Sequence, residues 1–69
     1  MNELSKAMHS AMEKRGWRED MVAKRSGLDL EVVHGLAHGW VGMTRARAKR
    51  LAKAFAFTDV HYWSKFMEV

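Results

Sequence analysis

The residues best able to do chemistry in this chain are two histidines, His34 and His38. They stand four positions apart, so on a helix both imidazoles lie on one face, and such a pair can bind a metal ion. Glycine follows His34, whereas zinc proteases have a glutamate after the first histidine of the pair. No third ligand is evident, and the chain has no cysteine. We therefore expect no metal site and no cofactor.

The rest of the sequence also disfavours an enzyme. We find no paired carboxylates, no nucleophile with a base, and no glycine-rich phosphate loop. The formal net charge of +4 suits a polyanionic partner, although many basic proteins carry such a charge only for solubility. The N-terminus lacks the apolar core of a signal peptide, and no run of residues has the length of a membrane span. We expect a cytoplasmic protein with no membrane partner.

Five helices are expected to position the histidines. Proline is absent, and the helix formers alanine, methionine, lysine, arginine and glutamate are plentiful. A chain of 69 residues suffices for one domain, residues 1–69. Apolar residues recur at helical spacing from Leu4 to Met12, and Gly16 ends that helix. The later helices are predicted at about residues 19–25, 30–38, 45–56 and 59–67. The predicted fold class is all-α.

Residues that start and stop helices support these boundaries. Asp29, Thr44 and Thr58 stand just before three of the helices, where a side-chain oxygen can accept a hydrogen bond from the backbone. Gly27 follows the second helix and suits a left-handed turn. Trp40 stands in the loop after the third helix, and we expect it to pack on the core, the commoner place for a tryptophan.

The stretch from residue 19 to residue 38 has the spacing of a helix-turn-helix. Ala23 is small, which lets the two helices cross closely, and Gly27 permits the tight turn between them. The apolar residues expected to fill the angle between the helices are Val22, Leu28, Val33 and Leu36. A generic helical hairpin needs none of these residues at fixed offsets. The spacing therefore indicates a helix-turn-helix core at about residues 19–38.

With these residues, nearly the whole chain resembles the Cro/C1-type (Xre-like) helix-turn-helix transcriptional regulators. The run from Val22 to Gly39 is similar to the DNA-binding domain of phage lambda repressor, and residues 50–55 match the fourth helix of that family. Thr44 and Trp63 stand where HigA-type antitoxins have a threonine and a tryptophan. The resemblance implies a five-helix, lambda-repressor-like domain that binds operator DNA as a dimer and represses its own promoter. HigA-type members also bind a small toxin protein, a ribonuclease.

The chain departs from this family in three respects. Glu19 replaces the usual glutamine at the start of the second helix, and a carboxylate there would repel a DNA phosphate. Ser26 stands at a position that is usually apolar. The exposed side of the third helix has no arginine, lysine, asparagine or glutamine, which are the usual base-reading residues.

In this fold the third helix enters the major groove of DNA. The exposed side of that helix would carry Glu31, His34, Gly35 and His38, and the first three are the expected base-reading residues. Glu31 could accept a hydrogen bond from cytosine N4, and His34 could donate one to guanine. Glycine within a helix costs about 1 kcal/mol relative to alanine. Three reasons for Gly35 stay open: a closer approach to the groove, room for another helix, or neutral drift.

Phosphate contacts are expected from cations near helix N-termini beside the third helix. The candidates for contacts to the DNA backbone are Arg18, His38, Arg45 and Arg47. His38 matches a polar residue that contacts the backbone in lambda-like members of the family. The other cations of the fourth helix are expected to form a solvated face: Lys49, Arg50 and Lys53.

The last predicted helix is unusually aromatic. A small core has little room for every aromatic side chain near the C-terminus, and an exposed remainder would form an interaction patch. The expected dimer interface consists of Val60, Tyr62, Trp63, Phe66 and Met67. A two-fold dimer there would hold two reading helices about 34 Å apart, which is one turn of DNA. The alternative is that these residues complete the core of the monomer.

The sequence therefore predicts a sequence-specific double-stranded DNA-binding transcriptional regulator. We expect a homodimeric repressor of its own promoter that binds an inverted repeat and is nucleoid-associated when bound. The alternative is an antitoxin or phage regulatory protein that acts mainly through protein–protein contacts and binds DNA weakly. Glu19 and Glu31 favour that alternative, whereas Gly35 and the flanking arginines oppose it.

Overall fold

The computed structural model describes residues 2–67 of the 69-residue chain. All regular structure within those residues is helical. The five helices are α1 (Glu3–Arg15), α2 (Glu19–Ser26), α3 (Leu30–His38), α4 (Arg45–Ala54) and α5 (Val60–Ser64). The expected all-α class and the expected number of helices are confirmed for this part of the chain.

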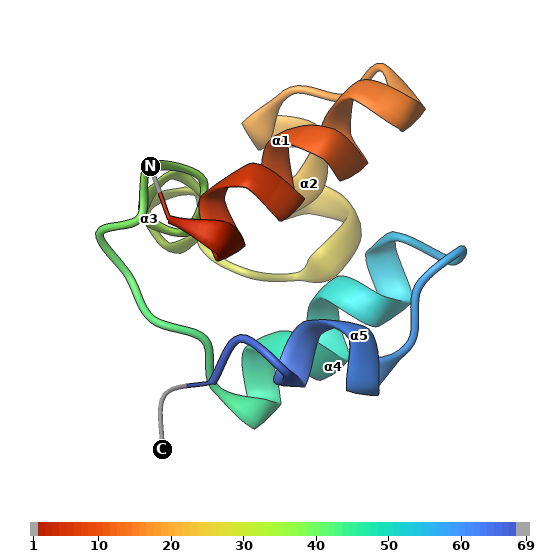
Figure 1. The fold of residues 1–69 in the computed structure, drawn as a ribbon. Coiled ribbons are helices and arrows are strands. Elements are labelled where there is room, and N and C mark those ends of the chain that lie inside the picture. The colour runs from red at the N-terminus through yellow and green to blue at the C-terminus, as the bar shows by residue number, and fades with distance from the viewer. Residues whose placement is uncertain (1, 68–69) are drawn as a thin grey trace.

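The helices form two groups around a shared core (Figure 1). α3 packs against both α1 and α2, and α4 packs against α5. α2 also contacts α4, which joins the two groups. In Figure 1, α4 and α5 lie below the first three helices, and the chain reaches them through the long loop after α3. None of the described helices combines the length and apolar character needed to cross a membrane.

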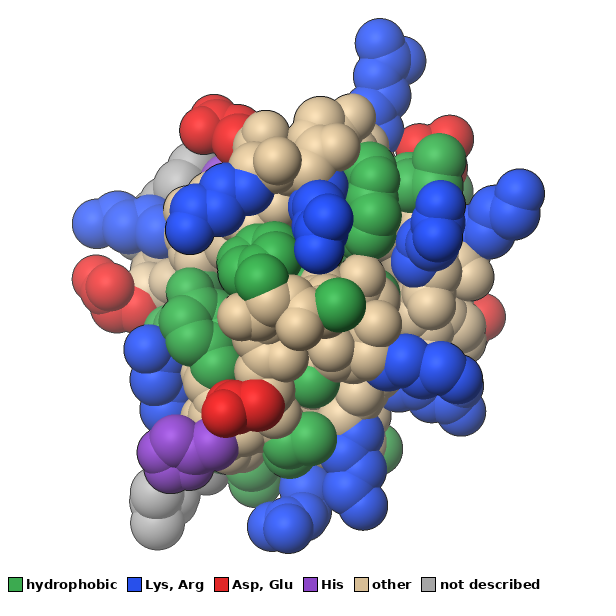
Figure 2. Space-filling view, turned by 90° about the vertical axis from the view of Figure 1, so that its right-hand side faces the viewer, with side chains coloured by type: hydrophobic (Ala, Val, Ile, Leu, Met, Phe, Trp, Pro, Cys, Tyr) green, Lys and Arg blue, Asp and Glu red, His purple; other side chains and the backbone are tan. Residues whose placement is uncertain are grey.

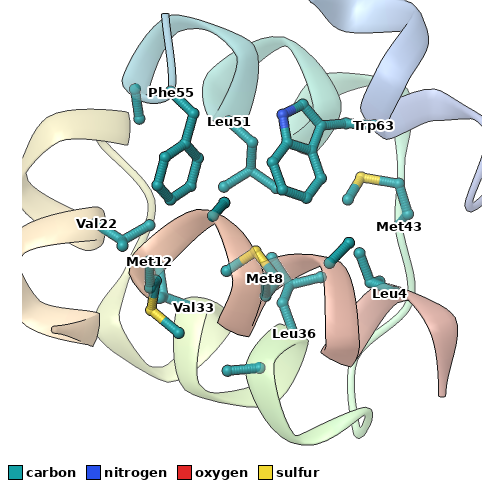
Figure 3. Close-up of a cluster of buried hydrophobic side chains, with 14 of the residues drawn as sticks. Leu4, Met8, Met12, Val22, Val33, Leu36, Met43, Leu51, Phe55 and Trp63 are labelled. Carbon is teal, nitrogen blue, oxygen red and sulfur yellow. The ribbon is translucent and has the colours of Figure 1, made fainter. Parts of the chain in front are cut away.

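The core is built from the inner faces of all five helices. Figure 3 shows Met8 of α1 beside Leu36 of α3, with Leu51 and Trp63 facing them from α4 and α5. The largest side chains that are completely buried are Trp63, Phe55, Met8, Leu36, Leu51, Val22 and Val33. Each such burial contributes roughly 1.5–3 kcal/mol. Because every helix supplies at least one of the core residues, no helix can be removed without exposing the others.

Ser26 is a polar residue inside this core, at the position where an apolar residue was expected. It is 2% exposed. Its hydroxyl accepts a hydrogen bond from the backbone N–H of Leu28 at 3.2 Å and lies 3.5 Å from the carbonyl oxygen of Ala23. A buried hydroxyl is tolerated when it is hydrogen-bonded in this way. Ser26 thereby fastens the end of α2 to the turn that follows.

The helix ends agree with the prediction for α3 and differ for α4 and α5. α3 spans the predicted residues 30–38. α4 ends two residues earlier than expected, because the backbone of Phe55 leaves the helical conformation at φ −100°, ψ 85°. α5 is shorter than residues 59–67. Beyond Ser64 the N–H groups of Phe66 and Met67 bond three residues back, as in a tight turn.

The predicted N-caps are only partly correct. Thr44 caps α4, since its hydroxyl oxygen accepts a backbone N–H of the first turn at 3.2 Å. Asp29 occupies the N-cap position of α3, but its side chain makes no capping hydrogen bond. α5 is capped by Asp59, whose carboxylate accepts a backbone N–H at 2.7 Å. The prediction that Thr58 caps α5 is therefore wrong by one residue.

Thr58 instead holds Trp63 in the core. The Thr58 hydroxyl donates to the carbonyl of Phe55 and accepts a hydrogen bond from the indole N–H of Trp63, each at 2.7 Å. Trp63 is completely buried, and its ring centroid lies 5.7 Å from that of Phe55. The expectation that Trp63 lies in a dimer interface is wrong. It completes the core of the monomer, which was the alternative reading of the aromatic C-terminus.

Replacing Trp63 by alanine is expected to destabilise the domain strongly, whatever its state of association. Truncating a buried tryptophan costs about 3–5 kcal/mol, and a chain of this length has a total stability of roughly 3–10 kcal/mol. Circular dichroism during heating measures the effect. The control is Tyr62→Ala, since the neighbouring Tyr62 is 36% exposed and should change Tm much less. A W63A variant with an unchanged Tm would contradict the placement of this side chain.

Candidate nucleic-acid interface

α2 and α3 are joined by only three residues, and the first of them is Gly27. Gly27 has φ 78°, in the left-handed region that favours glycine. A Cβ at this position would also stand 2.8 Å from the guanidinium of Arg50. On the inner side of the turn, Val22 of α2 and Val33 and Leu36 of α3 are completely buried. The predicted packing of α2 on α3 is therefore observed.

The opposite side of α3 faces solvent. Glu31, His34 and His38 are exposed there, as predicted. Leu30 is exposed as well, at 52%, and sequence analysis does not single it out. The signal available in the sequence was its spacing, because Leu30 stands four residues before His34 and so shares its side of the helix. The outer side of α3 thus offers apolar, acidic and imidazole groups within one short helix.

Gly35 is buried and does not belong to this exposed side. A Cβ at Gly35 would overlap Cγ2 of Val41 and stand 3.0 Å from the Cβ of Val41. The backbone N–H groups of Trp40 and Val41 both donate to the Gly35 carbonyl, at 2.8 and 3.2 Å. The prediction that Gly35 reads bases is therefore wrong. Its missing side chain makes room for the loop after α3, and neither for DNA nor for another helix.

Trp40 lies outside the core, contrary to expectation. It is 72% exposed. Its ring stacks on the imidazole of His38, with centroids 4.9 Å apart, and meets the imidazole of His34 edge-on at 5.4 Å. Trp40 takes this position because the two hydrogen bonds to the Gly35 carbonyl turn the loop back along α3. Trp40 therefore covers one side of the two histidines.

Glu19 joins both histidines to the start of α2. His34 Nδ1 donates to Oε1 of Glu19 at 2.6 Å, and His38 Nε2 lies 3.7 Å from Oε2 of the same carboxylate. The two imidazole centroids are 4.2 Å apart. His34, a predicted base reader, is thus already hydrogen-bonded within the protein. Helical spacing cannot predict this contact, because it joins residues fifteen positions apart through the crossing of α2 on α3.

The predicted phosphate-binding arginines differ in their exposure and in their contacts within the protein. Arg18 and Arg45 are exposed, at the N-cap of α2 and at the first residue of α4. Arg47 is partly buried, and its Nη1 donates to the Gly42 carbonyl at 2.9 Å. Arg50 is exposed, as expected, and its guanidinium also lies beside the turn at Gly27. The turn between α2 and α3 therefore carries a cation that sequence analysis misses.

The N-terminal half of α3 lies between two shallow depressions, and arginines border both. One depression has Arg18 and Leu30 in its lining, together with the acidic residues Glu19 and Asp20. The other lies between the turn and α4, and Val32, Arg47 and Arg50 are part of its lining. Two of the predicted backbone contacts, Arg18 and Arg47, thus lie on opposite flanks of α3.

α4 is strongly basic. Its ten residues include five cations and no acidic residue. Within residues 2–67, none of these cations forms an ion pair with a carboxylate. The first turn of α4 contains Arg45 and Arg47, although the helix dipole favours negative charge there. An anion bound at the N-terminus of α4 would therefore offset the repulsion between these arginines and the positive end of the helix dipole.

Only part of the predicted dimer surface is accessible to a partner. Val60 and Phe66 are half-buried, and Tyr62 and Met67 are exposed. The Lys65 ammonium lies 4.4 Å from the centre of the Tyr62 ring. On the side drawn in Figure 2, lysine and arginine side chains project around separate apolar areas.

None of the protein-family models, curated proteins or solved structures compared with the chain matches it.

Gly35→Ala is expected to destabilise the protein by up to about 2 kcal/mol. The overlap with Val41 should cost about 1–3 kcal/mol, against a gain of about 1 kcal/mol in helix propensity. Urea unfolding measures the change. Gly42→Ala is the control, because nothing lies within 4 Å of a Cβ at Gly42. Adding Val41→Ala to the Gly35 variant should recover part of the loss, and a Gly35→Ala protein as stable as the parent would show that the loop does not press on α3.

Proposed function

We propose that this protein is a sequence-specific double-stranded DNA-binding transcriptional regulator that places α3 in the major groove. The observation that carries the proposal is the exposed outer side of α3 between two depressions, with Arg18 beside one of them and Arg47 and Arg50 beside the other. A helix fits the major groove, and cations beside it can contact the phosphates of both strands. The resemblance of residues 22–39 to lambda repressor supports the same function.

The N-terminal end of α3 supplies the base contacts in this proposal, as is usual for the motif. Glu31 is exposed and has no ion pair within residues 2–67. Its carboxylate can accept a hydrogen bond from cytosine N4. Leu30 can contact the methyl group of thymine. His34 uses Nδ1 for Glu19, so its Nε2 is the ring nitrogen left for a base.

The phosphate contacts come from Arg18 on one flank and from Arg45, Arg47 and Arg50 on the other. Arg47 uses one donor for the Gly42 carbonyl, and its guanidinium has further donors. Each phosphate that a cation neutralises releases counterions, so the affinity must fall steeply as salt rises. The charges of Arg45, Arg47 and Arg50 are available for this purpose, because no carboxylate among residues 2–67 pairs with them.

The proposal includes a homodimer that binds an inverted repeat and represses its own promoter, as the resemblance implies. Because Trp63 belongs to the core, the dimer would use the exposed Tyr62 and Met67 with the partly buried Val60 and Phe66. A two-fold partner would then place a second α3 about 34 Å away.

A protein-interaction module is the second candidate, and two observations favour it. Glu19 and Glu31 place carboxylates on the face that would meet DNA, and His34 is already bonded to Glu19. An antitoxin or phage regulatory protein with weak DNA binding would have this character. The two candidates differ in salt dependence, since only contacts to several phosphates require steep weakening of binding with salt.

Arg45→Ala is expected to weaken binding to all DNA sequences about equally, by about tenfold, and to reduce the slope of log K against log salt by about 1. The probe is DNA from upstream of the gene of this protein, measured by fluorescence anisotropy at several salt concentrations. Lys53→Ala is the matched control, because Lys53 is exposed at the other end of α4. Salt-independent binding by the parent protein would favour the interaction module.

Glu31→Gln is expected to change which sequences are selected from a randomised DNA pool, with a loss of roughly 1–3 kcal/mol at one cytosine position. Glutamine keeps the size of the side chain and changes its hydrogen-bonding pattern. Glu13→Gln, on exposed α1 surface, is the control and should leave the selected sequences unchanged. An identical consensus for the Glu31 variant and the parent would remove Glu31 from the reading face.

A further inference from the structure

The Glu19–His34–His38 cluster brings three groups of metal-ligand chemistry together on the surface. One ligand atom from each residue can be chosen so that all lie within 4.8 Å of one another. The carboxylate of Glu19 is the third ligand that was not evident in the sequence. It comes from α2, whereas both histidines come from α3. The cluster therefore exists only when α2 crosses α3 as it does here.

The surroundings hold the two imidazoles in place. His34 and His38 are one helical turn apart, with ring centroids at 4.2 Å. Trp40 packs on both rings from the loop that is bonded to the Gly35 carbonyl. This packing restricts the rotamers of the histidines, so less conformational entropy is lost when a ligand binds them.

The donor set suits a divalent transition metal. Neutral imidazole and carboxylate bind Zn²⁺ at about 2.0–2.2 Å, and two such ligands at the tetrahedral angle are about 3.3 Å apart. The pair of His34 and Glu19 at 2.6 Å must therefore open by less than about 1 Å, and the widest pair, at no more than 4.8 Å, must close by up to about 1.5 Å. The three side chains are 46%, 42% and 27% exposed for His34, His38 and Glu19, so they have room for that movement.

We propose that Glu19, His34 and His38 form a binding site for a divalent transition metal, with Zn²⁺ as the ion that fits the donor set. Two imidazole nitrogens and one carboxylate oxygen coordinate the ion, and its remaining position faces solvent. His34 then coordinates through Nδ1 and carries its proton on Nε2. The proton that Nδ1 donates to Glu19 in the metal-free protein moves to Nε2 or is released to solvent.

The site has a consequence that rests on the proposed function. Glu19 stands where α2 would cross the DNA backbone, and its carboxylate repels a phosphate. A bound Zn²⁺ reverses the local charge, and its open position can accept a phosphate oxygen. Zn²⁺ would therefore increase the affinity for DNA, and removal of the metal would decrease it.

The primary test needs no DNA. The untagged full chain is freed of metal with a chelator and titrated with ZnCl₂ by calorimetry. We expect one saturable site per chain. His34→Ala, His38→Ala and Glu19→Gln should each weaken binding about tenfold or more, since even groups that only orient a ligand contribute ten- to hundredfold. His61→Ala is the matched control, because His61 is an exposed histidine of α5 outside the cluster and should bind as the parent does.

Two further readouts separate binding at this site from binding elsewhere. At a hundredfold excess over Kd, Zn²⁺ should raise Tm by on the order of 10 °C. Cu²⁺ should quench the fluorescence of Trp40, and Trp40→Phe should remove most of that quenching. No saturable Zn²⁺ binding, or equal binding by His38→Ala and His61→Ala, would overturn the site. If the protein binds no DNA at any Zn²⁺ concentration, that result would count against the proposed function alone, because the calorimetric Zn²⁺ titration contains no DNA.

Discussion

The packing of α2 across α3 determines what the outer surface of this protein presents. Val22 on one helix and Val33 and Leu36 on the other are completely buried at the crossing, and Gly27 allows the chain to turn there. One residue of slip along α3 would rotate its side chains by about 100°. The contact between Glu19 and His34 would then be lost, although neither residue belongs to the core. Burial on the inner side therefore sets the chemistry on the outer side.

Local features of the sequence are sufficient to predict most of the helices. The bounds of α3 follow from its apolar spacing and from glycine at its end, and the cap of α4 follows from the hydroxyl of Thr44. These signals act over a few residues, so a single sequence contains them. α5 is predicted less well, because its cap and its last turn depend on where the aromatic residues can be buried. The hydroxyl of Thr58 is used for the indole of Trp63, which leaves the cap to Asp59.

The candidate site is predicted less completely, because the positions of its residues depend on the path of a loop and on contacts between helices. Gly35 faces Val41 because the loop turns back along α3, and Trp40 covers the histidines for the same reason. That loop has no periodicity from which its path could be inferred. Arg50 reaches the turn, and Glu19 reaches the histidines, through contacts between helices. Helical spacing places Glu31 and His34 on the exposed side correctly, but it cannot show which of the two is already hydrogen-bonded within the protein.

The positive charge of α4 also affects the stability of the domain. Arg45, Lys49 and Lys53 follow one another at intervals of four, where like charges repel and weaken a helix by a few tenths of a kcal/mol per pair. The helix persists because Ala48, Leu51 and Ala54 are buried beneath it. Dissolved ions screen such repulsion more strongly as salt rises, because the Debye length falls from about 10 Å at 0.1 M to about 3 Å at 1 M. Rising ionic strength should therefore increase the free energy of unfolding and lower the affinity for any polyanion. Tm and binding affinity would then change in opposite directions across one series of salt concentrations.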